Sequence, residues 1–257
     1  MPYKMTSFGG VTLPTRMTTD DLSTGSAENS LQRTLGGVFD LAQGARRLPL
    51  VRTVTHEGMY AASSAASLYT QAQALRNMLG TKAHLVRRRY DGAEQWTEAR
   101  LQSIDQPITV EEHFAFATNI RAVFAVAGAA WRASTTTTRT VAVGQGSTLA
   151  TINNGGTEPV SDAILTITAN TSITSLRIDL GDAHFTYTAT IQAGKTLTID
   201  CGALTVVNNS VGDYDHLILA SNHALAGWLE LAPGNNNIQI TATGTGTLQI
   251  NFYEQFV

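Results

Sequence analysis

The 257-residue chain is long enough for two ordinary domains, and its hydrophobic content of 43% is that of a globular protein. Charged residues make up only 14%, which indicates a weakly charged surface, as in Thr-rich β folds or where partner chains cover it. Residues 1–140 carry 15 Lys+Arg against 11 Asp+Glu, a net of +4, whereas 141–257 carry 2 against 9, a net of −7. A net charge of +4 is too weak to indicate nucleic-acid binding.

The cysteine count and the hydropathy pattern limit the cellular setting. The single cysteine, Cys201, excludes an internal disulfide and a CxxC metal site. The N-terminal sequence lacks the charged-then-apolar pattern of a signal peptide. The longest apolar run, 122–131, lies between two arginines and is too short to span a bilayer. We therefore expect a soluble protein that is made in the cytoplasm and does not insert into a membrane.

The first 34 residues begin with a short aromatic stretch and continue as RMTTDDLSTGSAENSLQR, a polar run without periodicity. Such a run predicts a long loop or arm that becomes ordered against another surface. Arg16, Asp20 and Asp21 are therefore candidates for contacts between subunits. Two strands are predicted next, at 34–40 and 46–56, with a glycine-containing turn between them.

Residues 61–79 form the only stretch with a strong helical pattern. The apolar positions recur at spacings of three and four, which places them on one face of a helix; they are Ala61, Ala65, Leu68, Ala72, Leu75 and Leu79. Ser63 and Ser64 suit the N-cap, and Gly80 follows where a left-handed residue ends a helix. The pattern predicts one helix packed on a sheet, an α+β arrangement.

A hairpin is predicted after the helix. The strand-like runs 82–90 and 95–104 flank Asp91 and Gly92, and Asp-Gly is one of the strongest short hairpin signals. A long strand at 111–126 follows. These elements define a mainly β first domain over residues 1–134 with one helix.

The sequence changes character after this domain. Residues 135–150 lose periodicity and include a threonine run, which predicts a linker. From 151 to 257, Asn-Gly, Gly-Asp and Pro-Gly-Asn turn signals separate short alternating runs such as AILTITA, SLRIDL and TLTID, with no helical period. Regularly spaced turns of this kind favour an antiparallel β-sandwich.

Arg87, Arg88 and Arg89 form the one charge run of interest. On a strand, the first and third share a face and the second takes the other, so the three cannot form a single patch. One interpretation is a solvated hairpin that pairs with Glu94 and Glu98. The other is that these arginines form ion pairs with a neighbouring subunit, which would make assembly sensitive to salt.

The sequence contains no GxSxG, HExxH, P-loop or EF-hand pattern. Asp213 and Asp215, in the run Asp-Tyr-Asp-His, are the best ligand-like cluster, because alternate acids on a strand could bind a cation through oxygen. The favoured alternative is a solvated loop. We therefore expect no catalytic, cofactor-binding or metal-binding residues, and a protein that is not an enzyme.

A family resemblance rests on the order of motifs in the second half, which are NNGGTEPVSDAILTIT, AGKTLTIDCGALTV, GWLELAPGNNNIQIT and a closing TLQINFYEQF. This order resembles the C-terminal galectin-like sandwich of the distal tail proteins of long-tailed, siphovirus-like phages. The first half, a sheet with one helix and a long arm, is similar to the tail-tube-like N-terminal domain of that family. The resemblance spans the whole chain.

The resemblance implies a structural virion protein of the phage tail tip, made in the host cytoplasm. It implies a hexameric ring joined to the tail-tube protein and to the hub or tip protein, with DNA meeting it only in transit through the channel. The sandwich would hold receptor-binding or baseplate parts on the outside. Residues 1–33 and the strands near 82–104 would then lie at contacts between subunits or rings.

Two other functions stay open. The chain could be a tail-tube subunit with an added domain, which would stack into long polymers. It could instead be a carbohydrate-binding module, because galectin-like sandwiches bind sugars in other proteins. Trp228 and Tyr214 are the candidates for contact with a sugar or a partner, and Trp228 is expected in the core or at an interface.

Overall fold

The computed structural model divides into two compact units. The first contains the described residues of 1–28 and 48–134, and the second those of 29–47 and 135–256. The structure describes residues 3–14, 19–20, 31–34, 37–40, 51–105, 117–127, 130–181, 183–220 and 228–256.

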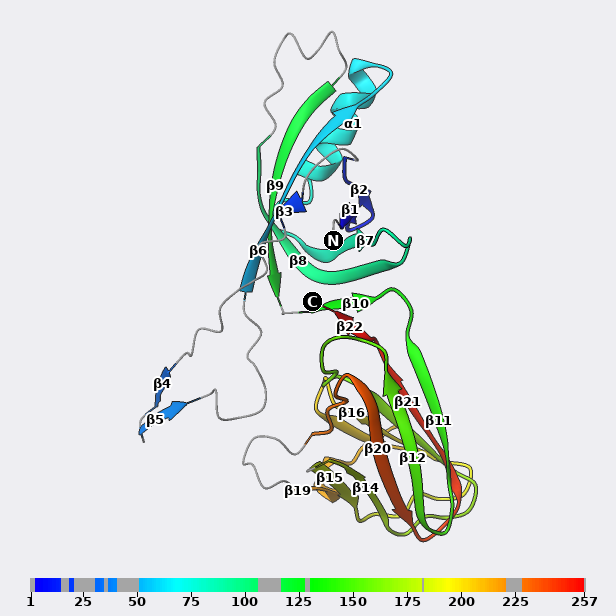
Figure 1. The fold of residues 1–257 in the computed structure, drawn as a ribbon. Helices are drawn as coiled ribbons and strands as arrows, with labels where there is room; N and C mark the ends of the chain where they lie inside the picture. The colour runs from blue at the N-terminus through cyan, green and yellow to red at the C-terminus, as the bar shows by residue number, and fades with distance from the viewer. Residues whose placement is uncertain are drawn as a thin grey trace. The chain divides into compact units, whose positions relative to one another are not determined.

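The first unit is built on an antiparallel sheet with strand order β2-β1-β7-β8-β9-β6-β3, and β10 also pairs with β8. The strands are β1 Lys4–Phe8, β2 Val11–Thr12, β3 Thr19–Asp20, β6 Val51–Ala61, β7 Lys82–Arg88, β8 Glu94–Asp105, β9 Ala117–Ala127 and β10 Trp131–Ala133. The long strands β6 and β9 pair along their full lengths, and α1 lies beside them (Figure 1).

The predicted hairpin is confirmed by β7 and β8, which pair antiparallel from Lys82 opposite Arg100 to Arg88 opposite Glu94. Gly92 has a φ of 89°, which favours glycine at this turn. The Asp91 side chain accepts a hydrogen bond of 3.1 Å from the backbone N–H of the second residue after it.

Helix α1 spans Ala65–Arg76. The Ser64 hydroxyl accepts from the Ser67 N–H at 3.2 Å, and the helix ends at the C-cap Asn77. The central apolar face is buried as expected, at Leu68, Ala72 and Leu75. The predicted span 61–79 is too long at both ends, because Ala61 continues β6 and Leu79, in the turn after the helix, is 51% exposed.

The N-terminal residues of the expected arm are partly integral to the sheet. Strand β1 pairs with β7, and Met5, Phe8 and Leu13 are almost fully buried. The Phe8 and Phe124 rings pack with centroids 5.0 Å apart. The prediction of a loop or arm is therefore wrong for this segment, because alternate apolar residues enter the core; residues 15–18 and 21–30 lie outside the described residues.

The second unit contains two antiparallel sheets, with strand orders β11-β21-β13-β16-β17-β18 and β12-β20-β14-β15-β19. The bounds are β11 Thr137–Val143, β12 Gly146–Asn154, β13 Ile164–Ala169, β14 Leu176–Leu180, β15 Ala183–Tyr187, β16 Thr196–Asp200, β17 Thr205–Asn208, β18 Val211–Gly212, β19 Leu217–Ala220, β20 Gly234–Ala242, β21 Gly246–Phe252 and β22 Gln255–Phe256, with the 3-10 helix η1 Tyr214–His216. A separate hairpin of β4 (Leu31–Thr34) and β5 (Gly37–Asp40) replaces the single strand expected at 34–40.

The inward faces of the two sheets form one hydrophobic core, and the predicted β-sandwich is confirmed. Along β20, for example, side chains alternate between buried and exposed positions. Each fully buried Leu, Ile or Phe contributes about 2 kcal/mol relative to an exposed one. Burial on this alternating pattern therefore fixes which face of each strand points inward.

The predicted linker at 135–150 is wrong, because most of this segment belongs to strands β11 and β12. In β11, Thr138 and Thr140 are exposed while Val141 and Val143 are buried. Threonine is β-branched and suits the solvent face of a strand. Thr138 and Thr140 therefore lie on the outer face of a sandwich strand.

Candidate functional site

An aromatic cluster that extends from the core to the surface lies beside β15 and β19 in the second unit. The Tyr214 and Trp228 rings have centroids 6.3 Å apart, and Trp228 meets Phe185 edge-on at 5.7 Å. Tyr214 is 50% exposed, whereas Trp228 is half-buried and packs against the core. The structure therefore brings together the two residues that the sequence nominated for contact with a sugar or a partner.

A hydrogen-bonded polar group holds η1 next to this cluster. The Tyr187 hydroxyl donates to Asp213, and the Asn208 side-chain amide donates to Tyr187 at 2.8 Å. His216 Nδ1 contacts the other oxygen of Asp213. The bond from Tyr187, followed by that from His216, lowers the pKa of Asp213, and burial raises the pKa of Tyr187. Asp213 therefore stabilises this turn. The cation hypothesis had assumed instead that Asp213 and Asp215 lie on an open strand.

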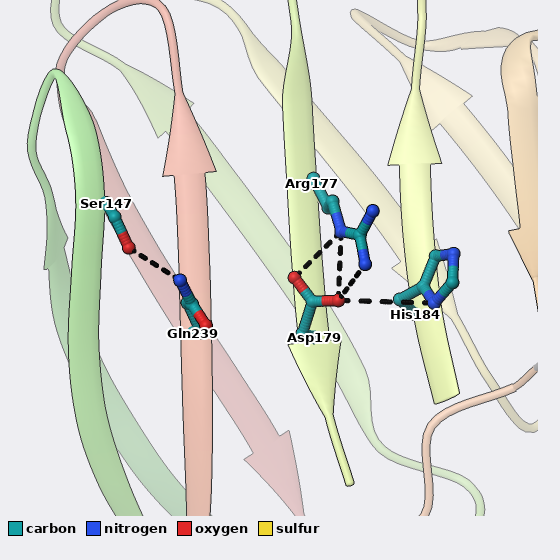
Figure 2. A network of polar contacts seen from close by, with 5 residues as sticks. All are labelled: Ser147, Arg177, Asp179, His184 and Gln239. Carbon is teal, nitrogen blue, oxygen red and sulfur yellow. Dashed lines mark hydrogen bonds and ion pairs between the residues drawn. The ribbon is translucent and has the colours of Figure 1, made fainter. Parts of the chain in front are cut away.

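The outer face of the second sheet carries a polar network that the sequence analysis missed (Figure 2). Both carboxylate oxygens of Asp179 lie 2.9 Å from Arg177 Nε, and His184 Nδ1 is 4.0 Å from the same carboxylate. Gln239 donates to the Ser147 hydroxyl at 2.8 Å. The available signal was the Arg-x-Asp spacing, which places both side chains on one face of a strand. Hydrogen bonding to Asp179 raises the Arg177 pKa.

Arg87 is fully buried, and the prediction of a solvated position is wrong for it. Its guanidinium carbon lies 3.8 Å from the ring centroid of Tyr3 and 4.3 Å from that of Trp131. Its Nε donates to the Gln95 side-chain oxygen at 2.8 Å. The cation and two aromatic faces form a cation–π sandwich. Arg87 thus belongs to the interior, and only its two neighbours remain surface candidates for contacts between subunits.

The other two arginines of the run do form ion pairs within the hairpin. Arg88 contacts Glu94 at 2.5 Å, with 54% of the arginine side chain exposed. Arg89 lies 3.2 Å from Asp91, with 32% exposed. Glu98, expected as an arginine partner, is instead 2.6 Å from Lys82, whose hydrogen bond lowers the pKa of Glu98. Exposed pairs of this kind stabilise a fold by less than about 1 kcal/mol.

The contact candidates of the N-terminal arm fall largely outside the described residues. Arg16 and Asp21 lie outside them. The backbone of Asp20 belongs to β3, where it pairs with Thr55 of β6. Their candidacy for contacts between subunits stays a prediction.

The described residues offer little for metal or membrane chemistry. Across these residues, no three His, Cys, Asp or Glu side chains gather closely enough to hold a metal ion. None of the helices in the described part of the chain has the length and apolarity needed to cross a membrane. The described surfaces carry aromatic, amide and ion-paired side chains, which are suited to binding another molecule.

Comparison with known proteins gives a family match and similar solved structures. Residues 155–256 match the family model described as "Siphovirus-type tail component, C-terminal domain". The crystal structure of Dit of phage SPP1, described as a paradigm of the hub adsorption apparatus in phages that infect Gram-positive bacteria, is similar with a TM-score of 0.66 and 15% identity, over 100% of both chains. A chain of the phage P2 baseplate in its activated, Ca-containing conformation has a TM-score of 0.41 and 8% identity, over 98% of this chain and 90% of that one. No curated protein matches.

The match over residues 155–256 supports one class of protein, a structural component of phage tails or baseplates. Within that class, the comparisons confirm the resemblance to the distal tail proteins of siphophages that the motif order indicated. At 15% identity, the similarity to the SPP1 protein concerns the fold.

Proposed function

We propose that this chain is a distal tail protein of the phage virion. Its first unit forms a ring, with six copies expected, that joins the tail-tube protein to the hub protein. Its second unit faces outward and holds receptor-binding or baseplate parts. The observation that carries the proposal is the family match over 155–256, and the fold similarity over the full length of both chains supports it.

The proposed role is structural and non-enzymatic. Hydrogen bonds join Tyr187, Asp213 and His216, and these groups connect η1 to β15. Their hydrogen bonds favour a role in holding the surface turn that carries Tyr214. A ring that binds other proteins needs rigid contact surfaces of this kind.

The first experiment is to determine the assembly state of the purified chain by light scattering on a sizing column, with negative-stain images of the peak. A closed ring with a central hole is the expected result. Long tubes would favour the alternative of a tail-tube subunit with an added domain. A strict monomer at high concentration and low salt would refute the ring.

The hairpin arginines provide a sharper test of the ring contacts. The variant R88E places two acids opposite each other, whereas R88E/E94R restores the pair within the chain and reverses its orientation. If Arg88 contacts a neighbouring subunit, both variants should weaken ring assembly. Assembly should then also depend less on the salt concentration. Recovery of assembly in the double variant would show that the pair acts only within the hairpin.

The arm requires a narrower test than removal of 1–33, because Met5, Phe8 and Leu13 are core residues. The triple variant R16A/D20A/D21A leaves these core residues in place. We expect weaker ring assembly with unchanged thermal stability. If this variant assembles as well as the wild type, the arm does not contribute to the contacts between subunits.

A second candidate function, carbohydrate binding by the second unit, is favoured by the pairing of Tyr214 with Trp228 at 6.3 Å. An exposed ring beside a polar turn is suited to stacking on the apolar face of a sugar. Binding of purified host cell-wall polysaccharide should then be lost in Y214A. The matched control is Y69A, which removes a 60% exposed tyrosine of α1; equal binding by both variants would reject this function.

A further inference from the structure

The two sides of the sandwich differ in how their sheet edges end. On one side the edge strands β18 and β19 are short, with two and four residues. On the other side stand β11, with seven residues, and β12, with nine. Natural sheets protect long edges with charges, prolines or bulges, because an open edge offers unpaired backbone groups to other strands.

Strand β12 has none of these protections. Its sequence, GSTLATINN, contains no charged residue and no proline, and its register with β20 runs without a bulge from Gly146 to Asn154. Within the described residues, no strand pairs with its other side. Leu149 extends into solvent at the middle of the strand and is 76% exposed. This combination marks β12 as a template for strand addition.

The register also shows which backbone groups of β12 point to the open edge. Thr243 N–H donates to Ser175 C=O at 3.2 Å, next to the pair Leu176 and Ala242. In an antiparallel ladder the hydrogen-bonded pairs alternate, so the odd-numbered residues of β20 bond to β14 and the even-numbered ones bond to β12. The backbone groups of β12 that face outward are therefore those of Ser147, Leu149, Thr151 and Asn153.

The charge around this edge indicates the chemistry of the occupant. Residues 135–256 carry 3 Lys+Arg against 9 Asp+Glu. The Glu254 carboxylate lies at the end of β12, where it accepts from the Gly155 N–H at 3.3 Å. A basic side chain on an incoming strand, opposite Asn153, would approach this carboxylate.

We propose that the open edge of β12 receives an extended segment of another tail protein, with alternating β-branched side chains and a basic residue opposite Asn153. The four outward residues supply the backbone hydrogen bonds, and Leu149 contacts a side chain of the added strand. The proposal rests on the proposed function for the identity of the partner as a tail protein. The site itself is a property of the edge and does not depend on ring formation.

The test uses the purified full chain and a dye-labelled, end-capped synthetic peptide, KTVTITVT, in fluorescence anisotropy. We expect saturable binding that is weaker by at least about tenfold for L149P, which removes one outward N–H, because main-chain hydrogen bonds carry the affinity. The matched control L149A removes the side chain but keeps the N–H, and it should bind more tightly than L149P. A peptide with glutamate in place of its lysine should bind more weakly than the original.

Amide hydrogen exchange tests the same site without any variant. In the free chain, the amides of Leu149 and Thr151 should exchange faster than those of Thr148 and Ala150, and the peptide should slow the exchange of the first pair. Absence of peptide binding, or equal binding by L149P and wild type, would overturn the proposal. Self-association of the wild type that L149P abolishes would identify a second copy as the occupant and would also overturn it.

Discussion

His56 should make the stability of the first unit depend on pH. The ring lies in β6 with 2% exposure, and burial lowers its pKa from 6.5 to about 4. The backbone of Pro14 opposes this shift in part, but neither ring nitrogen makes a well-formed hydrogen bond within the described residues. The folded protein therefore holds His56 as a neutral ring at pH 7.

The sign and size of the effect follow from linkage. Above pH 6.5 the ring is neutral in both states, and the stability is fully present. As the pH falls toward 4, the unfolded chain takes up a proton that the folded chain excludes, so the free energy of unfolding decreases. The full loss is about 3.5 kcal/mol, because the pKa differs by about 2.5 units at about 1.4 kcal/mol each. About 3 kcal/mol of it is lost by pH 4, where the folded ring is half protonated.

The assay is chemical denaturation of wild type and H56Q from pH 7.5 to pH 4. Glutamine does not titrate, so the difference in unfolding free energy between the two proteins should change by about 3 kcal/mol in favour of the variant as the pH falls. H84Q, which replaces an exposed histidine of β7, is the control. A constant difference between wild type and H56Q across this range would refute the reasoning.

Two further predictions concern the second unit. G246A should lower the free energy of unfolding by about 2 kcal/mol, because a Cβ at this position would lie 2.4 Å from the Thr168 carbonyl oxygen. G212A, whose Cβ meets nothing within 4 Å, should have a much smaller effect in the same thermal melt. Y187F should cost about 1 kcal/mol by loss of the bond to Asp213. It should also raise the Asp213 pKa, measured by NMR titration, and an unchanged pKa would contradict the assigned cause.

The elements that the sequence predicted best are those determined by near neighbours in the chain. The hairpin of β7 and β8 depends on Asp91 and Gly92, and both act within the turn itself. The start of α1 depends on Ser64, which caps an amide three residues later. Such interactions can be read from a few residues, because their partners are close in sequence.

Burial decided by distant residues could not be read in the same way. Arg87 appears in the sequence as part of a basic run, yet Tyr3 and Trp131 enclose its guanidinium from distant parts of the chain. The alternation along β7 correctly placed Arg88 on one face of the sheet and its two neighbours on the other. It could not show which of these faces points into the core, because that depends on where β1 and β10 join the sheet.

Of the candidate contact surfaces, one could be predicted from the sequence and the other could not. Tyr214 and Trp228 were accessible to sequence reasoning because sugar sites and protein interfaces commonly use aromatic rings. The open edge of β12 was not accessible in this way, because the sequence GSTLATINN is equally compatible with a strand in the middle of a sheet. The absence of a charge or proline in β12 acquires meaning only from the strand order, in which β20 is its one partner among the described strands. An unprotected edge is then evidence about assembly, because a strand that stays open in the mature particle would expose that particle to unwanted pairing.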